Sequence, residues 1–160
     1  MDARGGDNMN KRHAFGFALL LLALALLLCG CGAAPKKPLD ETVSAALVDK
    51  NGLMDFPADE LEMIADITAD GYTEYVYLTS EDGVSAREVI VLRAKDRQTA
   101  ADIRQKLTDY LERRRIETRD YLPDEYQLLS QAKVESKNLT VALIIGKDAA
   151  RETEALLKQE

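Results

Sequence analysis

Beyond Cys31 the chain contains no cysteine and no histidine, and it contains no tryptophan anywhere. Its two cysteines are Cys29 and Cys31, and its single histidine is His13. Disulfides, zinc–thiolate sites and a cysteine nucleophile are therefore excluded from the residues after Cys31, as is a histidine base for a serine nucleophile. Glycine patterns of hydrolases, P-loops and dinucleotide sites are also missing. These absences predict a protein that is not an enzyme and holds no cofactor or metal.

Positive charge is also scarce, with 21 Lys and Arg against 28 Asp and Glu and a net charge of -7. Nucleic-acid phosphates require clustered Lys and Arg, so the composition argues against a nucleic-acid partner. The one basic run is Arg113-Arg114-Arg115. It could form an anion or headgroup patch, but three consecutive helical residues spread around the helix. We expect a solvated helix face with i,i+4 pairs from Arg113 to Asp109 and Glu117.

One long apolar run, residues 14–28, follows Lys11 and Arg12. A basic start followed by a short apolar stretch is typical of a secretory signal peptide. As a helix the run reaches about 22 Å, short of the ~30 Å hydrocarbon core. We predict a signal peptide over residues 1–30. Either Met1 or Met9 could be the true start.

The run ends in Leu28-Cys29-Gly30-Cys31, which resembles the lipobox of bacterial lipoproteins. Leu28 and Gly30 suit positions -3 and -1 for the signal peptidase, whereas Cys29 at -2 is a small but unusual residue. Cleavage before Cys31 would leave its thiol to carry a diacylglyceryl group, with acyl chains such as palmitate in the membrane. This predicts a lipid-anchored protein on the extracytoplasmic face of the cell membrane. The alternative is an uncleaved single span, since the apolar stretch can be extended through Ala34.

Residues 31–38 form the lipidated cysteine and a short linker, and residues 39–160 predict a single α+β domain. Apolar spacing and capping residues predict helices at 40–50, 57–67, 96–119, 123–130 and 148–158. Strands are predicted at 72–79, 88–93, 133–135 and 139–145, with a tight turn at Asp82-Gly83.

A weak internal repeat relates residues 90–96 to residues 142–148, where an apolar strand runs into Lys-Asp and then a helix. Asp96 and Asp148 can each cap the helix that follows. We therefore expect two hairpin-plus-helix units that form an antiparallel sheet of about four strands, with helices packed on it. A true duplication and a chance likeness both remain open.

Few side chains are candidates for a site. Tyr75 and Tyr77 share a face of the first predicted strand and could contact a glycan or peptide, or pack under a helix. Hard-metal ligands could come from two carboxylate clusters, which helix starts and turns explain equally well. The first consists of Asp55, Asp59 and Glu60, and the second of Glu81 and Asp82.

Three segments of the domain resemble an uncharacterised family of bacterial lipoproteins found mostly in Gram-positive anaerobes, domain of unknown function 4358. The segments are Tyr75-Val76-Tyr77-Leu78-Thr79-Ser80, residues 86–96 (Ala-Arg-Glu-Val-Ile-Val-Leu-Arg-Ala-Lys-Asp) and Asp120-Tyr121-Leu122-Pro123-Asp124-Glu125-Tyr126. One departure is residues 64–67, where the family tends to carry a tyrosine. The resemblance implies an exported lipoprotein with an α+β fold; because no activity is established for the family, it leaves the function open.

Together these features predict a membrane-anchored, non-enzymatic binding or accessory module. Its partners would be the lipid bilayer, through acylated Cys31, and a protein, peptide or glycan at the cell surface. The alternative function is a carboxylate- and metal-dependent enzyme.

Overall fold

The computed structural model describes residues 36–160, and Lys37–Glu160 form one compact unit. The predicted signal peptide, Cys31 and the residues of the lipobox lie outside the described residues. In the described part, no helix is both long and apolar enough to cross a membrane.

Five strands form one antiparallel sheet in the order β1-β2-β3-β5-β4. The strands are β1 (Leu53–Asp55), β2 (Tyr72–Ser80), β3 (Glu88–Ala94), β4 (Val134–Lys137) and β5 (Thr140–Ile145). Two hairpins, β2–β3 and β4–β5, meet where β3 pairs with β5. The predicted α+β class and the two hairpins are confirmed, and β1 is an additional strand.

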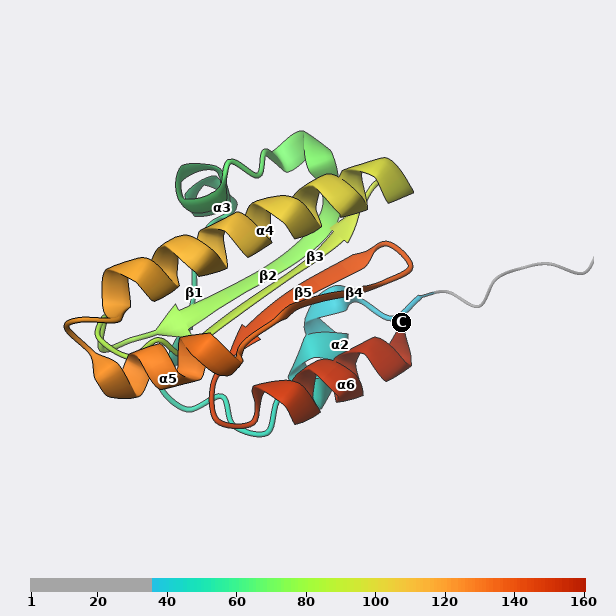
Figure 1. The fold of residues 1–160 in the computed structure, drawn as a ribbon. Helices are drawn as coiled ribbons and strands as arrows, with labels where there is room; N and C mark the ends of the chain where they lie inside the picture. The colour runs from blue at the N-terminus through green and yellow to red at the C-terminus, as the bar shows by residue number, and fades with distance from the viewer. Residues whose placement is uncertain (1–35) are drawn as a thin grey trace, which may run out of the picture. The chain divides into compact units, whose positions relative to one another are not determined.

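Helices cover both faces of this sheet (Figure 1). On one face lie α3 (Ala58–Ala65), α4 (Arg97–Thr118) and α5 (Pro123–Gln131), and on the other lie α2 (Leu39–Ala46) and α6 (Ala149–Gln159). A short 3₁₀ turn, η1 (Ala69–Gly71), leads into β2. The sheet therefore separates two hydrophobic cores.

The central strands explain this arrangement, because every residue of β3 and β5 is buried. Ile90 and Leu92 point into the core under α4, whereas Val89 and Val91 point into the core under α2 and α6. A strand that is apolar on both sides needs cover on both sides. The sequence signal for this is the unbroken apolar run rather than an alternating one.

Two predicted boundaries were wrong. The first helix ends at Ala46 because Leu47 is already extended, and Gly52, with φ 71°, lies in the turn before β1 rather than at a helix end. Asp82 and Gly83 belong to a wider loop between Ser80 and Glu88, not to a tight turn.

The two repeat units differ in detail. Asp96 caps α4 as predicted, since its carboxylate accepts a 2.8 Å hydrogen bond from the Thr99 backbone N–H. Asp148 makes no such bond to α6, so that capping prediction was wrong. The two helices also pack on opposite faces of the sheet.

Candidate functional site

Tyr75 and Tyr77 share a face of β2, as predicted, but only one of them is open to solvent. Tyr77 is buried in the core under α4 and packs against Phe56, with ring centroids 5.4 Å apart. Tyr75 is 37% exposed and meets Tyr72 edge-on at 5.7 Å. The rings therefore do not form one open patch, and Tyr75 alone offers an aromatic contact surface.

A groove of about 410 Å³ lies beside Tyr75, between α2 and β1, along the outer edge of β2. It exists because β1 pairs only with the last three residues of β2, Leu78 to Ser80. We call this cavity the Tyr75 groove. Its lining includes Asp40, Val43, Lys50, Asp55, Phe56 and Tyr75.

A buried carboxylate, Glu88, lies at the start of β3 and is 1% exposed. It accepts hydrogen bonds from the hydroxyl of Tyr77 at 3.1 Å and from that of Tyr110 at 2.9 Å. The Arg114 guanidinium lies 3.2 Å from Glu88 and donates to Tyr110 at 2.7 Å. Sequence reasoning missed Glu88, whose only signal was an acid at the head of an apolar strand.

Burial raises the pKa of Glu88, although Arg114 and the two tyrosine hydroxyls act in the opposite direction. The pKa values of Tyr77 and Tyr110 are also raised, mainly by burial and, to a smaller extent, by the negative charge of Glu88. The buried polar groups of this cluster form hydrogen bonds with one another. The main effect of the cluster is therefore to fasten α4 to the β2–β3 hairpin.

The basic run of α4 does not form the solvated face that we expected. Arg113 donates to the carbonyl of Ile64 in α3 and lies over the Tyr110 ring. Arg115 donates to the carbonyls of Leu129 at 2.9 Å and Ala132 at 2.7 Å, so it fixes the end of α5. The expected pairs of Arg113 with Asp109 and Glu117 are not formed. The three guanidiniums hold neighbouring elements instead.

The two carboxylate clusters named above, Asp55 with Asp59 and Glu60, and Glu81 with Asp82, do not form a metal site in the part of the chain that the structure describes. Within residues 36–160, no group of three or more His, Cys, Asp or Glu side chains could hold a metal ion. Asp82 accepts hydrogen bonds from the backbone N–H groups of Ser85 and Val84, which lower its pKa. Its position is thus explained by the loop that it organises.

The fold and these residues can now be compared with known proteins. A family model described as Domain of unknown function (DUF4358) matches residues 46–146. The chain belongs to this family. The matched range contains the whole sheet and the Glu88 cluster, whereas Asp40 and Val43 of the Tyr75 groove precede it. No curated protein and no solved structure matches the chain significantly.

Proposed function

We propose that this DUF4358 protein is a lipoprotein, anchored by a lipid on Cys31, whose domain acts outside the cell membrane as a non-enzymatic binding module. The observation that carries the proposal is how the domain begins. The Arg93 guanidinium donates to the carbonyl of Lys37 at 3.3 Å and to the Glu160 carboxylate at 2.6 Å. The backbone N–H of Leu39 donates to Glu74 at 2.9 Å, and Glu74 also binds Arg93.

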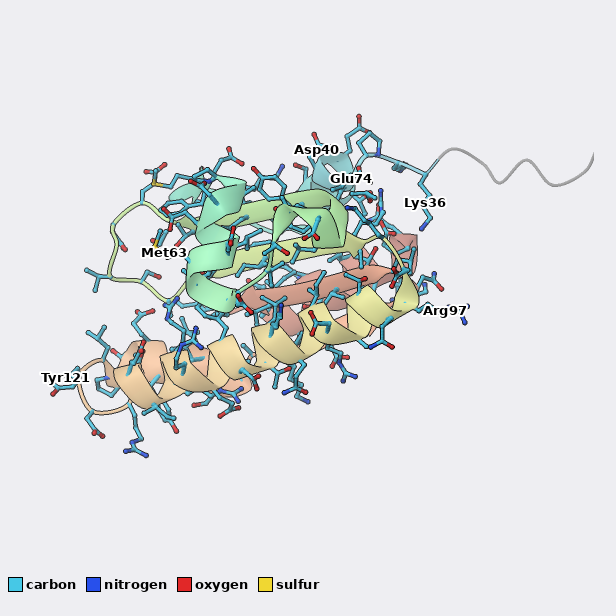
Figure 2. All side chains as sticks on the ribbon, turned by 90° about the horizontal axis from the view of Figure 1, so that it is seen from above. Lys36, Asp40, Met63, Glu74, Arg97 and Tyr121 are labelled. Atoms are coloured by element: carbon cyan, nitrogen blue, oxygen red, sulfur yellow. The ribbon has the colours of Figure 1, made fainter. Side chains whose placement is uncertain are left out.

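These contacts fasten the first residues of the domain to the end of the sheet where β3 finishes. Lys37 follows Cys31 by six residues, which span about 20 Å at most when extended. A lipid on Cys31 would therefore keep this end of the domain close to the headgroups. Figure 2 shows Arg97, at the start of α4, at one end of the domain and Tyr121 at the other. The Tyr121 end would point away from the membrane.

Binding is supported by the open Tyr75 groove, where an aromatic ring, apolar walls and a rim of Asp40, Lys50 and Asp55 suit a protein, peptide or glycan. The alternative function, a metal-dependent enzyme, requires carboxylates that bind Mg²⁺ or Ca²⁺. Calorimetric titration of the mature lipoprotein with Mg²⁺ and Ca²⁺ tests it: we expect no heat of binding, and saturable heat would favour the enzyme.

Anchoring is tested by comparing the wild type with Cys31→Ser and, as a matched control, Cys29→Ser in the native host. We expect the wild type and Cys29→Ser to reach the same processed size in the membrane fraction and to be digested by protease added to whole cells. Cys31→Ser should remain larger, because the signal peptide is not removed. Equal sizes for the wild type and Cys31→Ser would exclude the proposed anchor.

A further inference from the structure

One face of α3 is acidic and open to solvent. Leu61 and Ala65 of this helix are buried in the core under α4, whereas Asp59, Glu62 and Met63 are exposed. Asp59 precedes Glu62 by three residues and Met63 by four, so these three side chains share one side of the helix. Met63, which is labelled in Figure 2, is 75% exposed. We call this surface the α3 face.

The α3 face carries an excess of negative charge. Residues 51–86 contain no Lys or Arg, and the carboxylates of Asp59 and Glu62 form no ion pair with any residue that the structure describes. Two cations of α4 reach this helix, but only near its C-terminal end. There Lys106 pairs with the C-cap aspartate at 3.4 Å, and Arg113 donates to a backbone carbonyl. A partner with complementary charge must therefore be basic.

A buried hydroxyl without a partner lies close to this face. Tyr72 begins β2 and is 7% exposed, and its hydroxyl has no hydrogen-bond partner within residues 36–160. The other such atom in this range, Nε of Arg93, belongs to a guanidinium that already binds Glu160 at 2.6 Å. An unpaired buried hydroxyl costs free energy, so a ligand that donates a hydrogen bond to Tyr72 is favoured.

An aromatic ring and a carboxylate accompany this hydroxyl. The rings of Tyr72 and Tyr75 meet edge-on at 5.7 Å, and Tyr75 is 37% exposed. Burial is the main cause that raises the pKa of Tyr72, and Tyr75 and Glu62 raise it further. No Lys or Arg of the described residues acts against them. A hydroxyl oxygen, an open ring and an unpaired carboxylate are together suited to a guanidinium, which donates in several directions and stacks on aromatic rings.

We propose that the α3 face binds a segment of a partner protein through an arginine, whose guanidinium pairs with Glu62, donates to the hydroxyl of Tyr72 and lies against the ring of Tyr75. Met63 would contact an apolar side chain of the same segment, because its flexible thioether adapts to varied surfaces. This exposed apolar contact is the reason to expect a protein segment rather than a small guanidine.

The α3 face adjoins the Tyr75 groove, because Tyr75 contributes to both. Lys50 lines that groove and forms no ion pair with the α3 face among the described residues. A protein with an exposed arginine is thus a defined class of ligand for the proposed binding module, and in that respect the inference rests on the proposed function.

The probe is the synthetic peptide acetyl-Ala-Arg-Leu-Arg-Ala-amide, titrated into the ¹⁵N-labelled mature lipoprotein in nonionic detergent micelles and followed by NMR. We expect saturable shifts at the backbone amides of residues 59–66 and 72–75. The same peptide with citrulline in place of arginine keeps the shape without the charge and should bind about tenfold more weakly. N-acetylargininamide, which has one guanidinium and no apolar neighbour, should also bind about tenfold more weakly.

Variants make the assignment specific. Tyr72→Phe removes only the hydroxyl and should weaken binding of the arginine peptide about three- to fivefold. The midpoint of urea unfolding should not fall in this variant, because the hydroxyl has no partner within residues 36–160. Glu62→Gln should weaken binding by a similar factor, about three- to fivefold. Glu135→Gln, at an exposed acid on the opposite edge strand, is the matched control and should bind like the wild type.

Several results would overturn the proposal. These are equal binding of the arginine and citrulline peptides, unchanged binding to Tyr72→Phe, or shifts confined to residues outside α3 and the start of β2. Equal affinity for N-acetylargininamide would also overturn it, because the ligand would then be a small guanidine. Each of these outcomes would leave the anchor at Cys31 intact, because processing at Cys31 is measured separately.

Discussion

Arg87 and Glu152, 65 residues apart in the chain, form a two-pronged ion pair at 2.8 and 2.9 Å. Glu152, in α6, is 1% exposed and also accepts a 3.0 Å hydrogen bond from the backbone N–H of Val48, just after α2. Arg87, which precedes β3, donates further to the carbonyl of Ile145 at 3.1 Å. One buried carboxylate thus joins both helices of one face to the centre of the sheet.

We predict that Gly146→Ala weakens this junction. A Cβ at Gly146 would clash with Nη1 of Arg87, so the guanidinium must move away from Glu152. The free energy of unfolding should fall by about 1–3 kcal/mol, the range for overpacking. The part of the cost that comes from the clash should disappear in an Arg87→Ala background, whereas the part that comes from the positive φ of Gly146 (159°) should remain. Urea unfolding of the four proteins measures the coupling, and additive effects would contradict the close approach.

We predict different effects for the same substitution at the two tyrosines of β2. Tyr77→Phe removes a donor from buried Glu88 and should cost about 1–2 kcal/mol of unfolding free energy. Tyr75→Phe, at an exposed ring, should change it by less than about 0.5 kcal/mol. Thermal melts of the two variants under one set of conditions provide the comparison. A larger loss for Tyr75→Phe would show that the assignment of the buried hydroxyl is wrong.

We predict a pH-dependent difference between the wild type and Glu88→Gln. Burial raises the pKa of Glu88 above its ordinary value of 4.5, so the folded protein holds this proton more tightly than the unfolded chain does. The resulting contribution to stability is complete below that value and is lost as pH rises through the folded-state pKa. As the pH rises above about 4, the wild type should therefore lose unfolding free energy relative to Glu88→Gln. A relative gain would contradict the raised pKa.

We predict that the two aspartates of the repeat are not equivalent. Asp96→Ala removes the cap that holds the Thr99 N–H and should lower the melting temperature. Asp148→Ala should have a smaller effect, because Asp148 caps nothing and only pairs with exposed Arg151 at 3.4 Å. The Thr99 N–H lowers the pKa of Asp96, so the benefit of its cap is present above the ordinary pKa and lost on acidification. Equal melting curves for the two variants would contradict this difference.

The local elements could be predicted from sequence because their signals are local. The apolar stripe of α4, the β-branched run of β3 and the proline at the start of α5 each define an element within a few residues. β1 was missed because it has three residues, two of them exposed, so alternation is hardly detectable.

The partners of the buried charges could not be predicted, because each pair depends on the folded topology. Glu88 meets Arg114 through the packing of α4 on the sheet, and Glu152 meets Arg87 through the packing of α6. In the sequence these residues look like ordinary surface charges. Of the candidate site, Tyr75 was found by its place in a Tyr-rich strand. The groove beside it arises from the shortness of β1.

The anchor is tested most directly by the mass of the N-terminal tryptic peptide from protein extracted from native membranes. Trypsin cuts after Lys36 but not after Lys37, which precedes proline. The account predicts a peptide of residues 31–36 whose mass includes a diacylglyceryl group on Cys31. An unmodified peptide of residues 13–36, produced by cleavage after Arg12, would show that the apolar segment is retained and would contradict the account.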